Sequence, residues 1–279
     1  MLLYYAMGGG LGHLTRARAL LHTTGLDGEA ALFTSSSFAD DPRVTGGLRV
    51  VLVPAGLDGD SQGLRAFLER TISDLGVRLL VVDALPAGIL GELAGFGSPP
   101  GLEIWHVARL LRWEQYTEDA TARLPRFDVT YELEELHEDH RRALESSSAR
   151  IRRLELVDPP SAAPEPIETP YVLVVHSGPD EETSDLVEYA RDLLRAGESE
   201  ARIVLASPAR PATLPADVTW HDTFPATGLF ARAERIVTAA GFNVVRQTEP
   251  FREKRFLVPS PRRFDDQFTR AARARISEQ

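Results

Sequence analysis

Short apolar segments alternate along the chain with stretches in which apolar residues recur every three or four positions. The apolar segments predict buried β-strands, and the periodic stretches predict helices that bury one face. In the first half, strands are expected at 2–7, 30–33, 50–53, 79–82 and 104–108, with helices through 14–21 and 64–75. Strands that alternate with helices in this way form parallel βαβ units.

The same alternation restarts after a proline-rich segment, residues 158–170, whose composition predicts an extended connection between two domains. Beyond it the pattern predicts strands at 171–175, 203–206, 236–238 and 256–259, and helices at 185–195 and 264–276. The sequence therefore predicts an α/β protein with one domain at 1–157, a linker at 158–170 and a second domain at 171–279. Each domain has a glycine turn after its first strand, and two such domains that face each other form a cleft suited to a ligand.

Composition narrows the classes of chemistry. The 279 residues include 31 basic and 41 acidic side chains, a formal net charge of −10, and this disfavours sequence-independent binding of nucleic acid, which depends on neutralising phosphates. The chain has no cysteine, and Lys254 is its only lysine, so disulfides, thiol catalysis and lysine chemistry elsewhere are excluded. Because no apolar run approaches the length of a membrane span, we expect a soluble cytoplasmic protein, with peripheral membrane contact left open.

The first glycine turn, Gly8 to Gly12, is followed by His13 at the start of a predicted helix. A dinucleotide fingerprint needs a third glycine here and an acid after the second strand, and both are missing, so an NAD or FAD site is a weak interpretation. Glycines allow a ligand to approach the backbone, and a histidine at this position can act as a base near neutral pH. A packing turn whose histidine caps the helix fits the spacing equally well.

A second turn, Ala239 to Asn243, follows a predicted strand and opens a helix, so that Gly241 and Asn243 can present donors to a phosphate. Asp266 and Gln267 follow the next strand, and adjacent carboxylate and amide groups can hold sugar hydroxyls. Taken alone, each motif is more typical of an ordinary strand–helix turn or an N-capped helix.

Four motifs thus follow one another along the chain: Gly8-Gly9-Gly10-Leu11-Gly12-His13, Ala239-Ala240-Gly241-Phe242-Asn243, Val258-Pro259 and Asp266-Gln267. In this order they resemble the GT-B glycosyltransferases, in the branch of the MurG-like and UDP-glycosyltransferase enzymes. The resemblance covers both halves and implies two Rossmann-like domains that face each other across a cleft. It also implies transfer of a sugar, with inversion, from a nucleotide diphosphate donor, expected to be UDP-linked, to an acceptor hydroxyl, without a metal or another cofactor.

Carried over residue by residue, the resemblance gives each matching position a role. His13 matches the histidine that faces the acceptor as general base, and Gly10 and Gly12 match the glycines around it. Ser177 and Gly178 match the turn near the diphosphate. The remaining matches are to phosphate contacts at Gly241 and Asn243, to the ribose contact at Gln247, and to the pair that contacts the donor sugar, Asp266 and Gln267.

Two departures from the family pattern bear on these roles. In the family, an acidic residue binds the nucleotide ribose, and the matching residue here is Gln247. Its amide can accept a hydrogen bond from a hydroxyl but carries no charge. The chain is also short for a two-domain transferase, whereas MurG-like UDP-sugar hydrolases, which use water as acceptor, are about this length. Hydrolysis is therefore the alternative function, and a catalytically silent sugar-nucleotide binder is a third. The sequence leaves the acceptor and the sugar open.

Three further groups of polar residues have ordinary structural interpretations. Asp83 ends a predicted strand at the same edge as His13; it can orient that imidazole, but we favour a role in the turn 83–86. After the next strand, the start of an amphipathic helix is the preferred interpretation of Arg109, Arg112 and Trp113, rather than a lining of the cleft. His137 and His140 have a spacing that could hold zinc, but their charge-dense surroundings favour a solvated helix face.

Overall fold

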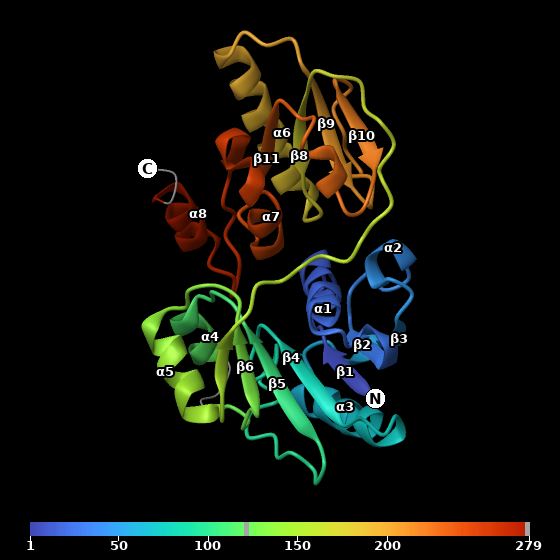
Figure 1. The fold of residues 1–279 in the computed structure, drawn as a ribbon, viewed down its shortest axis with the longest axis vertical. Helices are drawn as coiled ribbons and strands as arrows, with labels where there is room; N and C mark the ends of the chain where they lie inside the picture. The colour runs from blue at the N-terminus through green and yellow to red at the C-terminus, as the bar shows by residue number, and fades with distance from the viewer. Residues whose placement is uncertain (120–122, 277–279) are drawn as a thin grey trace. The chain divides into compact units, whose positions relative to one another are not determined.

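The computed structural model describes residues 1–119 and 123–276, and the chain folds into two compact units (Figure 1). Unit 1 consists of residues 1–159 together with 263–265, and unit 2 of residues 160–262 together with the chain from 266 onward. Residues 263–265 therefore belong to unit 1, although they lie within 171–279, the range predicted for the second domain. None of the described helices is both long and apolar enough to cross a membrane.

Unit 1 is built on a parallel sheet to which the described residues contribute seven strands, in the order β3-β2-β1-β4-β5-β6-β7. These strands are β1 (Leu2–Tyr5), β2 (Ala30–Thr34), β3 (Arg49–Leu52), β4 (Leu79–Asp83), β5 (Glu103–Ala108), β6 (Val129–Glu132) and β7 (Ile151–Arg153). The strand order reverses between β1 and β4. In open α/β sheets, ligands bind outside the carboxyl ends of the strands at such a switch point.

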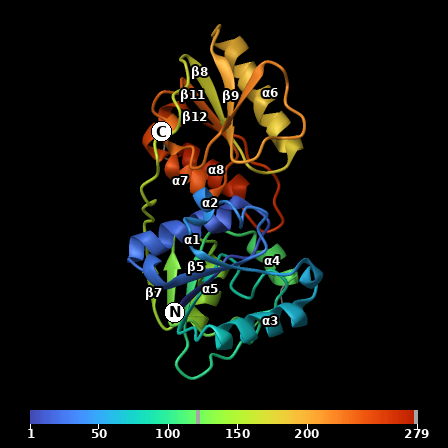
Figure 2. The ribbon, with the colours of Figure 1, turned by 90° about the vertical axis from the view of Figure 1, so that its right-hand side faces the viewer.

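Helices cover both faces of this sheet. They are α1 (Leu11–Thr24), α2 (Pro42–Thr45), α3 (Ser61–Asp74), α4 (Trp113–Asp119) and α5 (Glu138–Ser147), with short 3-10 turns at 27–29 and 55–57. Right-handed crossovers place α1 and α3 on opposite faces, as Figure 2 shows, because the chain leaves β1 in one direction along the sheet and returns in the other. On its own face, α3 packs Leu64, Leu68 and Ile72 into the main core.

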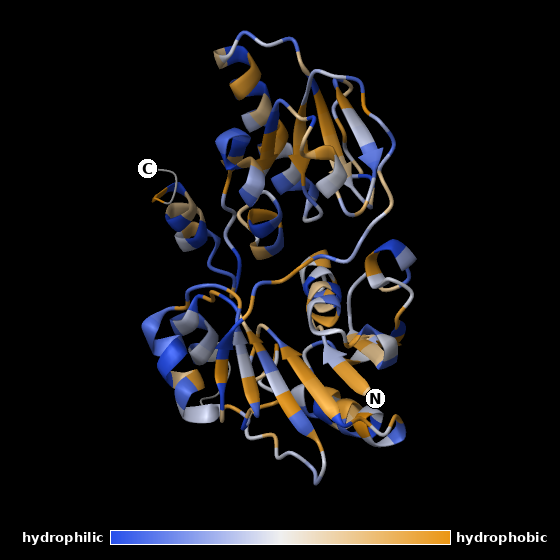
Figure 3. Ribbon diagram, in the orientation of Figure 1, coloured by the Kyte–Doolittle hydropathy of each residue, from blue (hydrophilic) through white to orange (hydrophobic). Residues whose placement is uncertain are grey.

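Unit 2 repeats this plan with a parallel sheet of five described strands, in the order β10-β9-β8-β11-β12. Its strands are β8 (Tyr171–Val175), β9 (Arg202–Ser207), β10 (Val218–Asp222), β11 (Arg235–Thr238) and β12 (Arg255–Leu257). Its helices are α6 (Asp180–Ala196), α7 (Phe242–Gln247) and α8 (Gln267–Ile276), with 3-10 turns at 227–229 and 249–254. The switch point of this sheet lies between β8 and β11. Figure 3 shows that β4 in unit 1 and β8 and β9 in unit 2 are largely apolar, as strands buried on both faces require.

The two parallel sheets confirm the predicted α/β class with two Rossmann-like halves. Three strands escaped prediction, β6, β7 and β10, because they are short and partly exposed and so carry little apolar signal. The last helix begins at Gln267 rather than at 264, since Phe264 and Asp265 pack against unit 1. The main-chain N–H of Arg112 donates to the oxygen of Phe264 at 2.8 Å, and the Phe264 ring meets that of Tyr116 edge-on.

The predicted linker contains no regular secondary structure among residues 158–168, but it is not a free spacer. Just before it, the N–H of Val157 donates to Oγ1 of Thr23 at 2.9 Å within unit 1. Further along, Pro164 lies directly against Gly228, and Ile167 packs against the apolar cluster around Tyr171 in unit 2. Each end of the segment is therefore held by its own unit.

Candidate functional site

His13 and Asp83 meet at the switch point of the unit 1 sheet. His13 is in the first turn of α1, directly after the glycine turn that follows β1, and Asp83 is the last residue of β4, the strand beside β1. Nδ1 of His13 lies 2.6 Å from Oδ2 of Asp83. The Asp83 side chain thus orients the imidazole, and our preference for a turn role was wrong. His13 also does not cap the helix, since the N-cap is Gly10 and lacks a side-chain cap.

Two further side chains hold the Asp83 carboxylate from the other sides. Arg16 donates from Nε to Oδ1 at 2.7 Å and from Nη2 to Oδ2 at 2.6 Å, and the hydroxyl of Tyr4 donates to Oδ1 at 3.0 Å. Arg16 is 2% exposed, so this is a buried, bidentate ion pair. Neither Arg16 nor Tyr4 is among the site residues predicted from the sequence. The available signal was an arginine three positions after His13, among the apolar positions of α1.

Burial favours a neutral His13 imidazole, although the Asp83 carboxylate opposes it. Burial alone would raise the pKa of Asp83, but the guanidinium of Arg16 and the His13 ring hold that pKa well below its usual range. Burial lowers the pKa of His13 from 6.5; Asp83 opposes this shift, while the positive charges of Arg16 and Arg109 add to it. With Nδ1–H donated to Asp83, the lone pair of the neutral ring lies on Nε2. This atom is the one that can accept a proton.

Gly8 makes room for the reactive side of the imidazole. Its φ is +144°, a region that residues with a side chain rarely adopt, and a Cβ there would lie 2.7 Å from Nε2 of His13. The His13 side chain keeps 15% of its surface exposed, whereas that of Asp83 has none. A glycine at this position therefore leaves room for the ring in the place where it lies.

Arg109 directly follows β5 at the same edge of the sheet and is also largely buried. It forms an ion pair with Asp265, on the three-residue segment that packs back against unit 1. Helix α4 starts at Trp113, so the predicted helix start is confirmed at Trp113, whereas Arg109 lies before the helix. Its charge acts instead on the pKa of His13.

The other predicted site residues of unit 1 lie in the glycine turn, with Gly10 at the N-cap of α1 and Gly12 inside its first turn, both exposed. Those of unit 2 lie after its strands. Ser177 and Gly178 form the exposed turn between β8 and α6, and Gly241 is the N-cap of α7, which contains Asn243 and ends at Gln247.

Asp266 and Gln267 both have structural contacts in unit 2. Oδ1 of Asp266 accepts a hydrogen bond from the N–H of Thr269 at 3.0 Å, as a cap on the start of α8. Gln267 is 4% exposed, and its Oε1 accepts from the N–H of Ser260 at 3.1 Å. These contacts fix where the two side chains stand after β12.

His140 does not lie on a solvated helix face. It is fully buried in α5, and its ring stacks on that of Trp113, with ring centres 4.2 Å apart. Our expectation of a solvated face was wrong for this residue. Over residues 1–119 and 123–276, no group of three or more histidine or acidic side chains is arranged to hold a metal ion.

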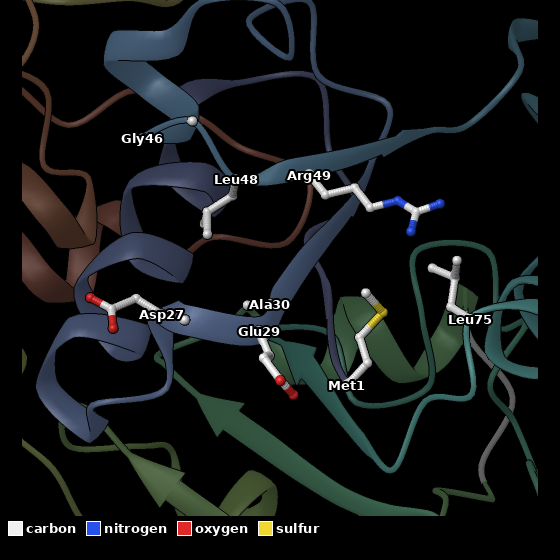
Figure 4. A pocket seen from close by; sticks show the side chains of 10 residues that line it. Met1, Asp27, Glu29, Ala30, Gly46, Leu48, Arg49 and Leu75 are labelled. Carbon is white, nitrogen blue, oxygen red and sulfur yellow. The ribbon is translucent and has the colours of Figure 1, made fainter.

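A cavity of about 680 Å³ lies at the opposite edge of the unit 1 sheet, beside the first residues of β1, β2 and β3. Figure 4 shows the side chains around it, with those of Asp27, Glu29 and Arg49 pointing away from one another. Because its polar groups do not converge, this cavity lacks the arrangement of a specific polar site. The functional candidates are the residues at the carboxyl edge.

Comparison with known proteins rests on structure. No protein-family model matches the chain, and no curated protein matches its sequence. The fold matches the spinosyn forosaminyltransferase SpnP with a TM-score of 0.62, at 13% identity over 99% of this chain and 83% of that one. It also matches the spinosyn rhamnosyltransferase SpnG in complex with thymidine diphosphate (TM-score 0.58, 13% identity, 99% and 84% covered).

A third match is the glycosyltransferase SnogD from Streptomyces nogalater, with a TM-score of 0.57 and 16% identity over 93% of this chain and 81% of that one. These structures are GT-B glycosyltransferases, and the chain therefore has the GT-B fold. At such identities the similarity establishes the fold, and the function has to be argued from the residues.

Proposed function

We propose that the protein is a metal-independent glycosyltransferase that moves a sugar from a nucleoside diphosphate donor to an acceptor hydroxyl, with no further cofactor. The observation that carries this proposal is His13, which lies 2.6 Å from the buried Asp83 in the first turn of the helix that follows the first strand of a GT-B fold. The three similar structures are all named as sugar transferases, and one of them is a complex with thymidine diphosphate. These names support a nucleotide-sugar donor. A uridine nucleotide is our first expectation for the donor, and thymidine is the alternative base.

The proposed reaction is one direct displacement at the anomeric carbon. The acceptor oxygen forms the new bond while Nε2 of His13 takes its proton, and the bond from the anomeric carbon to the diphosphate oxygen breaks. A single displacement inverts the configuration. Asp83 stays ionised throughout and stabilises the imidazolium that forms, because its own pKa is held low by Arg16.

The leaving diphosphate gains negative charge that unit 2 has to stabilise. In the proposal, main-chain N–H groups near Ser177, Gly178 and Gly241 provide this stabilisation, together with Asn243. Gln247 contacts the ribose hydroxyls through its amide. Asp266 and Gln267 contact the donor sugar.

The test is to incubate the purified protein with UDP-linked and TDP-linked sugars, with and without a panel of acceptors, and to measure release of the nucleoside diphosphate. Transfer predicts release that depends on an acceptor and stops when His13 is replaced by alanine. Full release from the donor alone would assign a hydrolase instead. Nucleotide binding without any release would indicate a silent binder and would overturn the proposal.

A further inference from the structure

Unit 2 has a histidine of its own near the first strand of its sheet. His176 follows β8 at the switch point between β8 and β11, where the fold offers its ligand site. Only 6% of its side chain is exposed. Its Nε2 is buried and makes no hydrogen bond to any of the described residues. A buried polar atom of this kind needs an acceptor, and in this structure a carboxylate oxygen lies beside it at ion-pair distance.

The carboxylate of Glu182, in the first turn of α6, lies on this atom. Oε2 of Glu182 is 3.2 Å from Nε2 of His176, within ion-pair distance but without the alignment of a hydrogen bond. On its other side, Arg262, which follows β12, grips both oxygens of Glu182 through its two terminal nitrogens. Burial raises the pKa of Glu182, but Arg262 lowers it, and a side-chain hydrogen bond from Ser260 acts in the same direction as Arg262, so that the pKa lies below its usual value.

Several positive or donor groups thus converge on one small anion at the switch point. A guanidinium binds a phosphate in the same two-pronged way in which it binds a carboxylate. Gly178 passes close over the same place, since a Cβ there would lie 2.6 Å from Nε2 of His176 and 3.3 Å from Oε2 of Glu182. The backbone of this turn can therefore approach whatever anion occupies the position.

We propose that His176 and Arg262 form an anion site for the diphosphate of the nucleotide sugar, and that Glu182 fills this site as an internal counter-anion until the diphosphate displaces it. The naming of the diphosphate rests on the proposed function. The partial exposure of the pair, 16% for Glu182 and 30% for Arg262, allows the carboxylate to swing out into solvent.

The other charges of this helix start agree with displacement. Asp180, Glu181 and Glu182 together make the first turn of α6 acidic, which opposes an anion at the helix N-terminus. Asp180 is turned aside, since its Oδ2 accepts from the N–H of Ala212 at 2.8 Å. Glu182 is therefore the carboxylate that competes directly for His176 and Arg262.

The test is whether one substitution, Glu182→Gln, lowers or raises the Kd for an anion. Glu182→Gln removes the competing charge and should lower the Kd for UDP, TDP and inorganic pyrophosphate about tenfold, as measured by calorimetry on the full chain. Arg262→Gln and His176→Ala should raise the same Kd, by about tenfold to a hundredfold for Arg262, because a hydrogen bond to a charged group is lost. If Glu182 and Arg262 were a purely structural pair, Glu182→Gln would leave the affinity unchanged or reduce it.

Glu168→Gln is the matched control. It removes one carboxylate from an exposed pair of the same unit, Glu168 with Arg202, whose Nη2 lies 2.8 Å from it at the opposite end of the sheet. The net charge changes equally, and the Kd should not change. Equal tightening in both variants, no tightening in Glu182→Gln, or no anion binding by either wild type or Glu182→Gln overturns the inference.

The outcome separates this inference from the proposed function. Turnover of a donor without the shift in Kd leaves the transferase standing and removes the anion site. The shift in Kd without turnover of any donor leaves the anion site standing and removes the transferase. If Arg262→Gln fails to fold, as judged by its melting curve, Glu182→Gln alone decides, because its expected sign is opposite to that of a structural loss.

Discussion

The two units surround their first histidine with the same kinds of residue but bury them differently. In unit 1 the carboxylate of Asp83 comes from the end of a strand and is fully buried together with Arg16. In unit 2 the carboxylate of Glu182 comes from the first turn of a helix, and both it and Arg262 keep part of their surface exposed. His13 faces its carboxylate through Nδ1, and His176 faces its own through Nε2.

This difference in burial and in orientation separates two kinds of chemistry. A carboxylate fixed by a sheet and neutralised by a buried arginine sets the tautomer of His13 and leaves Nε2 to take a proton. A carboxylate on a helix start that keeps part of its surface exposed can leave and make room for another anion. Similar residue types, in the connection that follows the first strand of each sheet, therefore suit proton transfer in one unit and anion binding in the other.

The largest expected difference is in stability. Asp83→Asn leaves Arg16 buried without its counter-charge and should reduce the free energy of unfolding by about 3 to 5 kcal/mol. Glu182→Gln should change it by less than about 1 kcal/mol, because that pair is partly screened by solvent. Urea unfolding of both variants checks this, and equal losses would contradict the distinction between the two units.

Gly8→Ala tests the position of the imidazole. The new Cβ would come too close to His13 Nε2 and would sit at a positive φ, so the ring must move, and turnover should fall about tenfold to a hundredfold. Gly178→Ala crowds His176 in the same manner and should instead raise the Kd for UDP. Gly97→Ala, where a Cβ meets nothing, is the control, and loss of activity there would show that the effect is not local.

The sequence predicted the strands and helices that carry strong apolar patterns, and it placed His13 and Gly241 at helix starts that follow strands, as in the structure. It brought Asp83 to the same edge as His13 but could not establish their contact, because contacts between side chains 70 positions apart depend on the order of strands in the sheet. Phe264 was assigned to a helix on local pattern, whereas its burial against Tyr116 decided its conformation. Glu182 is one of several acidic residues at the start of α6, and nothing in the local sequence distinguishes it from Glu181.

The pH dependence of turnover follows from the pKa of His13. Only the neutral ring accepts a proton, so turnover should fall about tenfold per pH unit below that pKa and stay level above it. Because burial lowers this pKa, the fall should begin below pH 6.5. Arg109→Gln removes a charge that lowers the pKa and should move the fall to higher pH. A midpoint above 6.5 in the wild type would contradict the assignment of His13.

The smallest expected effect concerns the ribose contact. Gln247→Glu replaces a neutral hydrogen-bond acceptor by a charged one and should lower the Kd for UDP by about twofold to tenfold. This would add to the anion site of unit 2 without touching unit 1. Weaker or unchanged binding in calorimetry would mean that Gln247 does not face the ribose.

The most direct test of the whole account compares His13→Ala with His176→Ala, measuring donor turnover at saturation, the Kd for UDP and the melting temperature of each. His13→Ala should lower turnover by about a hundredfold to ten-thousandfold with little change in Kd, because only the proton acceptor is lost. Its stability should hold, since Asp83 keeps Arg16 and Tyr4. His176→Ala should mainly raise the Kd. Full turnover in a well-folded His13→Ala protein would contradict the account.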